Sequence, residues 1–187
     1  MKKIPFYLIA AVMTVASCTG KTSTATPVTT ISEFEADDEH GDGIQRMHEY
    51  NFSNEIVVDG KTYTYSIHRE ASDSLPLVTD DEGTRYTDNI YTLTLSNSSG
   101  EVARYRLTKR NFLSYLSPEF QSKGILDGMM CDTTLTGFQF AVSVSLPQSD
   151  MVEPLILKVD PKGGMSISRD ERSHGAPEDK IQQDDGV

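Results

Sequence analysis

The 187-residue chain has only two cysteines and is poor in basic side chains, with 17 Lys and Arg against 28 Asp and Glu. The net charge of −11 argues against binding to nucleic acid, because Lys and Arg side chains must neutralise its phosphates. Cys18 lies at the end of a predicted export signal, which leaves Cys131 without an intramolecular partner. The fold is therefore not expected to depend on a disulfide.

Recognisable catalytic and cofactor-binding motifs are also lacking. The four histidines show no metal-ligand spacing, and there is no HExxH, no GxSxG, no phosphate-binding glycine loop and no dinucleotide fingerprint. Residues 38–49 partly match an EF-hand calcium loop, but His40 stands where Asp or Asn belongs, and a solvated acidic linker is favoured. The sequence therefore predicts no metal and no cofactor, and it selects no catalytic residue. A Ser–His pair that forms only in the fold stays open.

The N-terminal residues have the layout of a bacterial lipoprotein signal. Two lysines precede an apolar stretch at residues 4–16, and Val15-Ala16-Ser17 leads into Cys18. The apolar stretch holds about 13 residues, fewer than the roughly 20 that span a bilayer, and no other segment is apolar and long enough to do so. We therefore expect residues 1–17 to be a cleaved signal peptide and Cys18 to carry diacylglycerol. The alternative is an ordinary secretory signal with an unrelated cysteine.

Composition divides the rest of the chain into a tether, one domain and a tail. Residues 18–50 are rich in Ser and Thr and then acidic, and they lack the apolar side chains that offset the entropy of ordering. We interpret them as a flexible tether behind the lipidated cysteine. Residues 51–172 have the length of a single domain. Residues 173–187 are polar and acidic, which is typical of a disordered tail.

Apolar and polar side chains alternate through most of residues 51–172, which predicts β-strands. In the clearest strand, residues 138–146, every second side chain is large and apolar. About seven strands are expected, at residues 56–58, 61–68, 91–95, 101–107, 138–146, 155–159 and from 165 onward. One or two short helices follow the fourth strand, because Thr108 can cap one helix and Ser117-Pro118 can begin another. The predicted fold is mainly β (α+β), either one antiparallel sheet or a small sandwich.

Basic side chains gather in one short stretch of this acidic chain. The four cations Arg104, Arg106, Lys109 and Arg110 fall within seven positions, and the first two share the outward face of a strand. Such a patch can bind a carboxylate or a phosphate of a partner. The alternative, which we favour, is that these side chains pair with the acidic residues of neighbouring strands.

The signal at Val15–Cys18, the segment 111–130 and the closing run 138–169 together resemble a group of small lipoproteins of unknown function from gut Bacteroidetes. The group has no established activity, so the resemblance assigns no catalytic residue. It implies the periplasmic face of the outer membrane, because no acidic cluster follows Cys18. It also implies O-glycosylation at an Asp-Ser/Thr-apolar pattern, for which Ser74 and Thr133 are the candidates.

Together these observations predict a membrane-anchored lipoprotein of the cell envelope that acts without catalysis. We expect a binding or interaction module for a protein or glycan partner, with the membrane contacted through the lipid anchor. The alternative is an envelope hydrolase or a small-ligand carrier. That alternative requires a concave pocket with convergent polar groups, or a titratable residue with a strongly shifted pKa.

Overall fold

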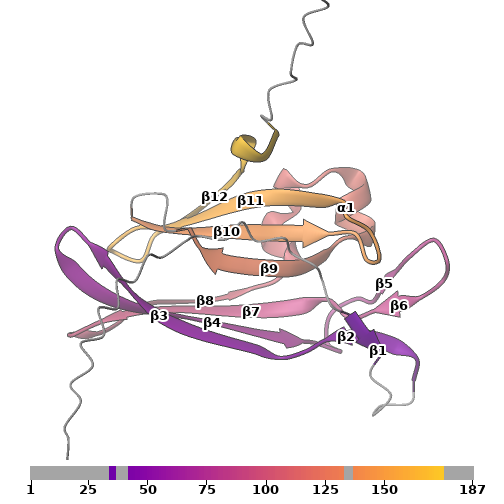
Figure 1. The fold of residues 1–187 in the computed structure, drawn as a ribbon, viewed down its shortest axis with the longest axis horizontal. Coiled ribbons are helices and arrows are strands. Elements are labelled where there is room, and N and C mark those ends of the chain that lie inside the picture. Colours follow the sequence, from indigo (N-terminus) through magenta and orange to yellow (C-terminus); the bar gives the residue numbers. More distant parts are fainter. Residues whose placement is uncertain (1–33, 37–41, 133–136, 175–187) are drawn as a thin grey trace, which may run out of the picture.

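The computed structural model describes residues 34–36, 42–132 and 137–174, and these residues form a mainly β domain (Figure 1). Twelve strands in three sheets occur among them, with two short helices between the eighth and ninth strands and one after the last. The predicted fold class is confirmed, and so is the place of the helices after the fourth expected strand. Cys18 and Thr133 lie outside the described residues.

The first large sheet has the antiparallel order β3-β4-β7-β8. Its strands are β3 (Tyr50–Val58), β4 (Lys61–Ala71), β7 (Asn89–Asn97) and β8 (Gly100–Leu107). Asp59 and Gly60 join β3 to β4, both with positive φ, as the tight turn of an Asp-Gly hairpin requires. Consecutive strands of this sheet are therefore joined as hairpins, except that a loop containing two short strands separates β4 from β7.

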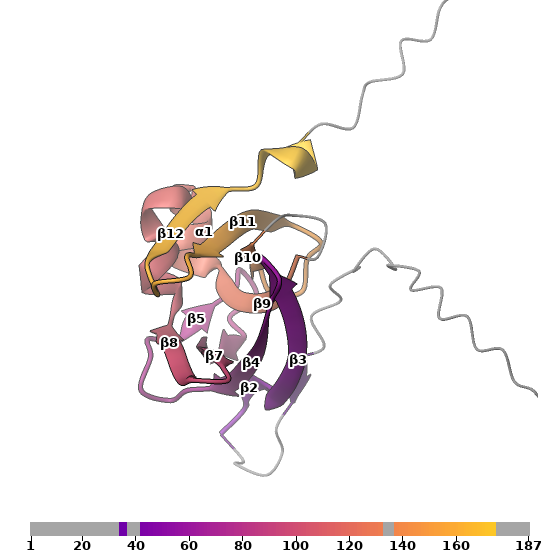
Figure 2. The ribbon, with the colours of Figure 1, turned by 90° about the vertical axis from the view of Figure 1, so that its left-hand side faces the viewer.

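The second large sheet has the antiparallel order β12-β11-β10-β9. Its strands are β9 (Ile125–Cys131), β10 (Phe138–Ser145), β11 (Val152–Val159) and β12 (Met165–Arg169). Figure 2 shows this sheet on one side of the domain and β3, β4, β7 and β8 on the other. Of the two predicted arrangements, the structure is therefore the sandwich.

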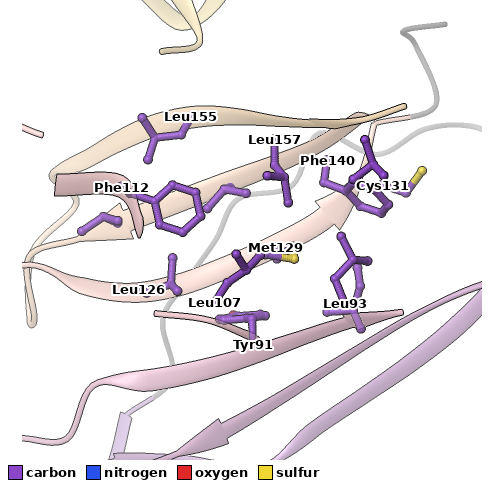
Figure 3. Packing of buried hydrophobic residues seen from close by; sticks show 14 of the residues in the cluster. Tyr91, Leu93, Leu107, Phe112, Leu126, Met129, Cys131, Phe140, Leu155 and Leu157 are labelled. Atoms are coloured by element: carbon purple, nitrogen blue, oxygen red, sulfur yellow. The ribbon is translucent and has the colours of Figure 1, made fainter. Parts of the chain in front are cut away.

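The core lies between the two large sheets, where the alternating side chains of both meet (Figure 3). Leu157 on β11 and Phe112 from the helical segment are completely buried, and Tyr91 on β7 is 1% exposed. Tyr63 and Tyr65 of β4 pack edge-on against Phe138 and Phe140 of β10, with ring centroids 4.7 and 5.7 Å apart. These aromatic pairs join the two layers directly.

A third, smaller sheet lies at one end of the sandwich and has the order β1-β2-β6-β5. It consists of β1 (Phe34–Ala36), β2 (Ile44–Met47), β5 (Val78–Thr79) and β6 (Arg85–Tyr86), with β2 parallel to β6. The sequence did not predict these strands or β9. Two-residue strands are too short to leave an alternating pattern, and Asp127-Gly128 interrupts the alternation of β9.

Strand structure also begins before the boundary at residue 51. Met47, at the end of β2, is 5% exposed, and the β3 strand starts at Tyr50. Residues 44–50 thus belong to the domain and not to the expected tether. The remainder of residues 18–50 lies outside the described residues, apart from the three-residue strand β1 and residues 42 and 43.

Three short helices complete the described structure. The 3₁₀ helix η1 (Lys109–Tyr115) begins after Thr108, whose backbone N–H donates to Asn111 Oδ1 at 2.9 Å. Helix α1 (Pro118–Lys123) begins with proline at its first position, as predicted, and ends at Gly124. A second 3₁₀ helix, η2 (Glu171–His174), follows β12. Helices η1 and α1 thus lead the chain from the first large sheet into the second.

Candidate functional site

A pocket of about 600 Å³ is lined by residues of η1, α1 and the loop that precedes β5. Figure 1 shows α1 and β5 at the end of the sandwich that carries the small sheet. One wall is the consecutive run from Leu75 to Val78, and Leu113 of η1 contributes to the other wall. Asp88 and Lys109 lie among the lining residues, and so do Ser74 and Arg110. This volume lies within the range of small-molecule sites, and the combination of apolar walls with a few polar groups is typical of them.

Local hydrogen bonds position the elements around the pocket. The loop after β4 is fastened where the Ser72 backbone N–H donates to the Asp88 carbonyl at 3.0 Å, and the Leu75 N–H donates to the Ser72 carbonyl at 3.2 Å. On the opposite side, the Gln121 side-chain amide donates to the carbonyls of Leu113 and Leu116. The pocket is therefore built from two segments that are far apart in the sequence and are each held by their own backbone contacts.

The central polar feature of the pocket is the buried pair of Asp88 and Lys109. Lys109 Nζ donates to the Gly124 carbonyl at 2.6 Å and lies 3.9 Å from Asp88 Oδ2. Asp88 Oδ1 accepts from two backbone N–H groups, those of Asn89 at 2.8 Å and Leu126 at 2.9 Å. The side chains of Asp88 and Lys109 are 6% and 13% exposed, so both charges are held largely away from water.

Burial shifts the pKa of both groups toward their neutral forms. Burial raises the pKa of Asp88, against the opposing effects of the Leu126 N–H, the Lys109 charge and the Asn89 N–H. Burial likewise lowers the pKa of Lys109, and the Asp88 charge opposes that shift. The pair is thus largely desolvated, and the attraction between the two charges opposes the shift of each pKa.

The structure divides the four cations that the sequence groups together. Arg104 and Arg106 lie on the outer face of β8, and Arg104 pairs at 2.6 Å with Glu101 of the same strand, not with an acidic residue of a neighbouring strand. Lys109 and Arg110 instead line the pocket. Neither Arg106 nor Arg110 has an ion-pair partner among the described residues, and both side chains are exposed. Only two of the four predicted patch residues therefore share a site.

Sequence reasoning missed Asp88 and the apolar wall of the pocket. Asp88 stands between Tyr86-Thr87 and Asn89-Ile90, in a run of buried residues with no alternation to mark a polar site. The wall from Leu75 to Val78 reads as an ordinary loop. Nothing in the sequence places either segment near Lys109, which is more than 20 positions away from both.

The remaining predicted site residues are the two glycosylation candidates and the lipidated cysteine. Ser74 is exposed and lines the pocket, with its Oγ 2.8 Å from Ser72 Oγ. Thr133 and Cys18 lie outside the described residues. Among the residues that the structure does describe, no three His, Cys, Asp or Glu side chains are grouped to hold a metal ion.

A second, smaller pocket of about 300 Å³ lies where β10, β11 and β12 meet the turn at Asp160. Of its two charged lining residues, Lys158 and Asp160, the second is already engaged, since Asp160 Oδ1 accepts from the backbone N–H groups of Lys162 at 2.7 Å and Gly164 at 2.9 Å. These hydrogen bonds lower the pKa of Asp160 and hold the turn together. This pocket is accordingly the weaker candidate for a binding site.

Fold and site together define a β-sandwich domain with a charged pocket at one end. The chain belongs to the DUF4738 family, a domain of unknown function, whose profile matches residues 29–167. No curated protein matches the chain. The match includes residues 29–50, in agreement with the strands that the structure places before residue 51. Within the described residues, no helix has the length and apolar character needed to cross a bilayer.

Proposed function

We propose that this protein is a membrane-anchored binding module of the cell envelope, and that it binds its partner through the pocket at Lys109 without catalysing a reaction. The pocket is the observation that supports this proposal. It combines apolar walls with a buried ammonium group, that of Lys109, and a guanidinium that has no ion-pair partner among the described residues, that of Arg110. A filled pocket would offer an acceptor to donors that have none among the described residues.

The anchor in this proposal is Cys18, which follows an apolar stretch of the length expected for a lipoprotein signal. Two or three acyl chains on one cysteine bind a membrane stably, whereas a single chain binds only marginally. The resemblance to Bacteroidetes lipoproteins supports the periplasmic face of the outer membrane as the location. The partner is then a protein or a glycan of the envelope, part of which enters the pocket.

The pocket also favours a second candidate, a carrier of a small ligand. The volume of the pocket is that of a small-molecule site, and its apolar wall would shield a ligand from water. A hydrolase is less well supported, because the hydroxyls at the pocket are engaged in local contacts. Ser122 Oγ donates to the carbonyls of Pro118 and Glu119, and Ser74 Oγ contacts Ser72 Oγ.

The test is crosslinking in living cells, followed by capture of the acylated full chain and analysis of the bound protein, glycan and small molecules. The variant Ser122→Trp places an indole at the pocket, and Ser114→Trp places one on an exposed position of η1 that does not line it. We expect one component to be captured stoichiometrically by the wild type and by Ser114→Trp, and to be lost with Ser122→Trp at an unchanged melting temperature.

The nature of the captured component separates the two candidates. A protein or glycan supports the partner-binding module, and a low-molecular-mass compound supports the carrier. Capture that Ser122→Trp leaves intact would refute binding through the pocket, and so would the absence of any stoichiometric component.

A further inference from the structure

We infer that the pocket at Lys109 binds a carboxylate attached to an aliphatic chain, in the form of a free organic acid of medium length. This inference rests on the second candidate function, the carrier of a small ligand, and names the ligand class of the same pocket. Three features of the described residues lead to it: the free hydrogen-bond donors, the balance of charge, and the chemistry of the walls.

The donors come from Lys109 and Arg110. An ammonium group has three N–H donors, and Lys109 Nζ makes one hydrogen bond within 3.5 Å, to the Gly124 carbonyl. The Asp88 carboxylate, at 3.9 Å, is too far for a second hydrogen bond. Arg110 adds a guanidinium that makes no hydrogen bond to any described residue. The pocket therefore offers several cationic donors to an incoming acceptor.

The charge balance favours an anion over a neutral or cationic group. Two cations and one carboxylate line the pocket. The carboxylate of Asp88 is already stabilised on its other oxygen by two backbone N–H groups, so it does not need a cationic ligand. A ligand carboxylate near Lys109 and Arg110 would form charge-assisted hydrogen bonds, the stronger class of such bonds.

The walls favour an aliphatic body. Leu75, Pro76, Leu77 and Val78 follow one another along one side, and Leu113 adds an apolar surface from η1. Leu77 is 41% exposed, and a ligand chain would cover it. No aromatic side chain lines this pocket, so the described residues offer no platform for stacking a sugar ring or a base.

The inference is tested by isothermal titration calorimetry on the acylated full chain in lipid nanodiscs, with empty nanodiscs as the blank. Three probes share a six-carbon chain and differ in their polar group: hexanoate, hexanol and hexylamine. We expect saturable binding of hexanoate and at least roughly tenfold weaker binding of the other two, a ratio that corresponds to about 1.4 kcal/mol. Hexanol that binds as tightly as hexanoate would overturn the inferred role of the charge.

Two variants locate the binding and keep the test independent of folding. Arg110→Gln removes the unpaired cation at the pocket, and Arg106→Gln makes the same change on the outer face of β8. We expect a several-fold loss of hexanoate affinity for Arg110→Gln and none for Arg106→Gln. Equal affinities for the two variants would contradict a site at this pocket.

The calorimetric titration and the crosslinking experiment test different claims, so a failure of one can be distinguished from a failure of the other. Failure of all three probes to bind would overturn the inferred ligand class. The proposed function would still stand if Ser122→Trp abolished capture of a different component. If capture were also insensitive to Ser122→Trp, the pocket would have no binding role and both proposals would fall.

Discussion

Among single residues, Asp88 and Lys109 connect the pocket to the stability of the domain. A buried ion pair stabilises a protein little in itself, since desolvation of both charges offsets their attraction. Loss of one partner is costly, because the other charge is then left buried without compensation. The pair also contacts β9 and the end of α1, since Asp88 accepts from the N–H of Leu126 on β9 and Lys109 donates to the Gly124 carbonyl.

We predict that Lys109→Met lowers the free energy of unfolding by about 3 kcal/mol, because it leaves the Asp88 carboxylate buried without its cation. Adding Asp88→Asn should recover a large part of this loss, since the Asn oxygen can still accept from the two backbone N–H groups. Urea denaturation of the two single variants and the double variant provides the measurement. Strictly additive losses would show that the two charges do not interact.

Asp170 makes stability depend on pH in the acid range. It is 7% exposed and accepts from Arg172 Nε at 2.8 Å and Nη2 at 2.7 Å, which lowers its pKa below the usual 3.8. When the pKa of a carboxylate is lower in the folded state than in the unfolded state, its ionised form stabilises the fold at pH values above the unfolded-state pKa. This stabilisation is lost as the pH falls through the folded-state pKa.

We therefore predict that the loss of stability between neutral pH and about pH 3 is smaller in Arg172→Gln than in the wild type. Arg169→Gln, an exposed change on β12, is the matched control and should lose stability with pH as the wild type does. Chemical denaturation at the two pH values measures the difference. The prediction fails if Arg172→Gln and Arg169→Gln show the same dependence on pH.

Among the structural elements, β9 connects the two large sheets. The pairing with β10 shifts register between Ser143 and Val144, opposite Asp127, which marks a β-bulge. At this bulge the Asp127 carbonyl accepts from Tyr91 Oη at 2.6 Å and from Arg69 Nη1 at 3.1 Å, both on the other large sheet. Ser143 Oγ donates to Asp127 Oδ1 at 2.7 Å. The bulge thus provides polar contacts that a regular strand would lack.

We predict that Gly128→Ala disrupts this bulge. A Cβ at Gly128 would lie 2.1 Å from Ser143 Oγ, so the hydroxyl would have to leave the buried Asp127 carboxylate. The expected loss in the free energy of unfolding is about 2 kcal/mol, in the range for an unsatisfied buried polar group. Chemical denaturation checks this value.

The double variant Gly128→Ala with Ser143→Ala gives the decisive comparison, because it removes the colliding oxygen. Its loss should be smaller than the sum of the two single losses. A double variant that loses the full sum would show that the contact between Gly128 and Ser143 is not the cause.

For the whole molecule, the proposed anchor and the described domain have separate physical origins. The proposed anchor would depend on acyl chains at Cys18, whereas the domain depends on the apolar faces of two sheets, with the buried Cys131 as a free thiol.

We predict that Cys18→Ala releases the protein from the membrane fraction and abolishes metabolic labelling with palmitate, because the sulfur that carries the lipid is gone. Cell fractionation and labelling measure the two effects, with Cys131→Ala as the matched control that should keep both. Membrane association of Cys18→Ala that survives an alkaline wash would contradict the lipoprotein assignment.

The sequence by itself determined the fold class, because strand alternation is a local property. In β10, Phe138, Phe140 and Val142 point into the core in register, and that pattern is visible without any partner strand. The helix start at Ser117-Pro118 was predicted for the same reason, since backbone constraints act between neighbouring residues. β9 and the small sheet could not be predicted, because a bulge and two-residue strands depend on their partners.

Only the tertiary structure decided which charged residues form a site. The sequence groups Lys109 with three arginines, but the direction of each side chain depends on its element, and η1 turns Lys109 and Arg110 away from the face of β8 that carries Arg104 and Arg106. Asp88 and the wall from Leu75 to Val78 reach Lys109 only when the chain folds back across the end of the sandwich. A pocket is made of contacts between distant segments, and burial and the pKa shifts at Asp88 and Lys109 follow from those contacts.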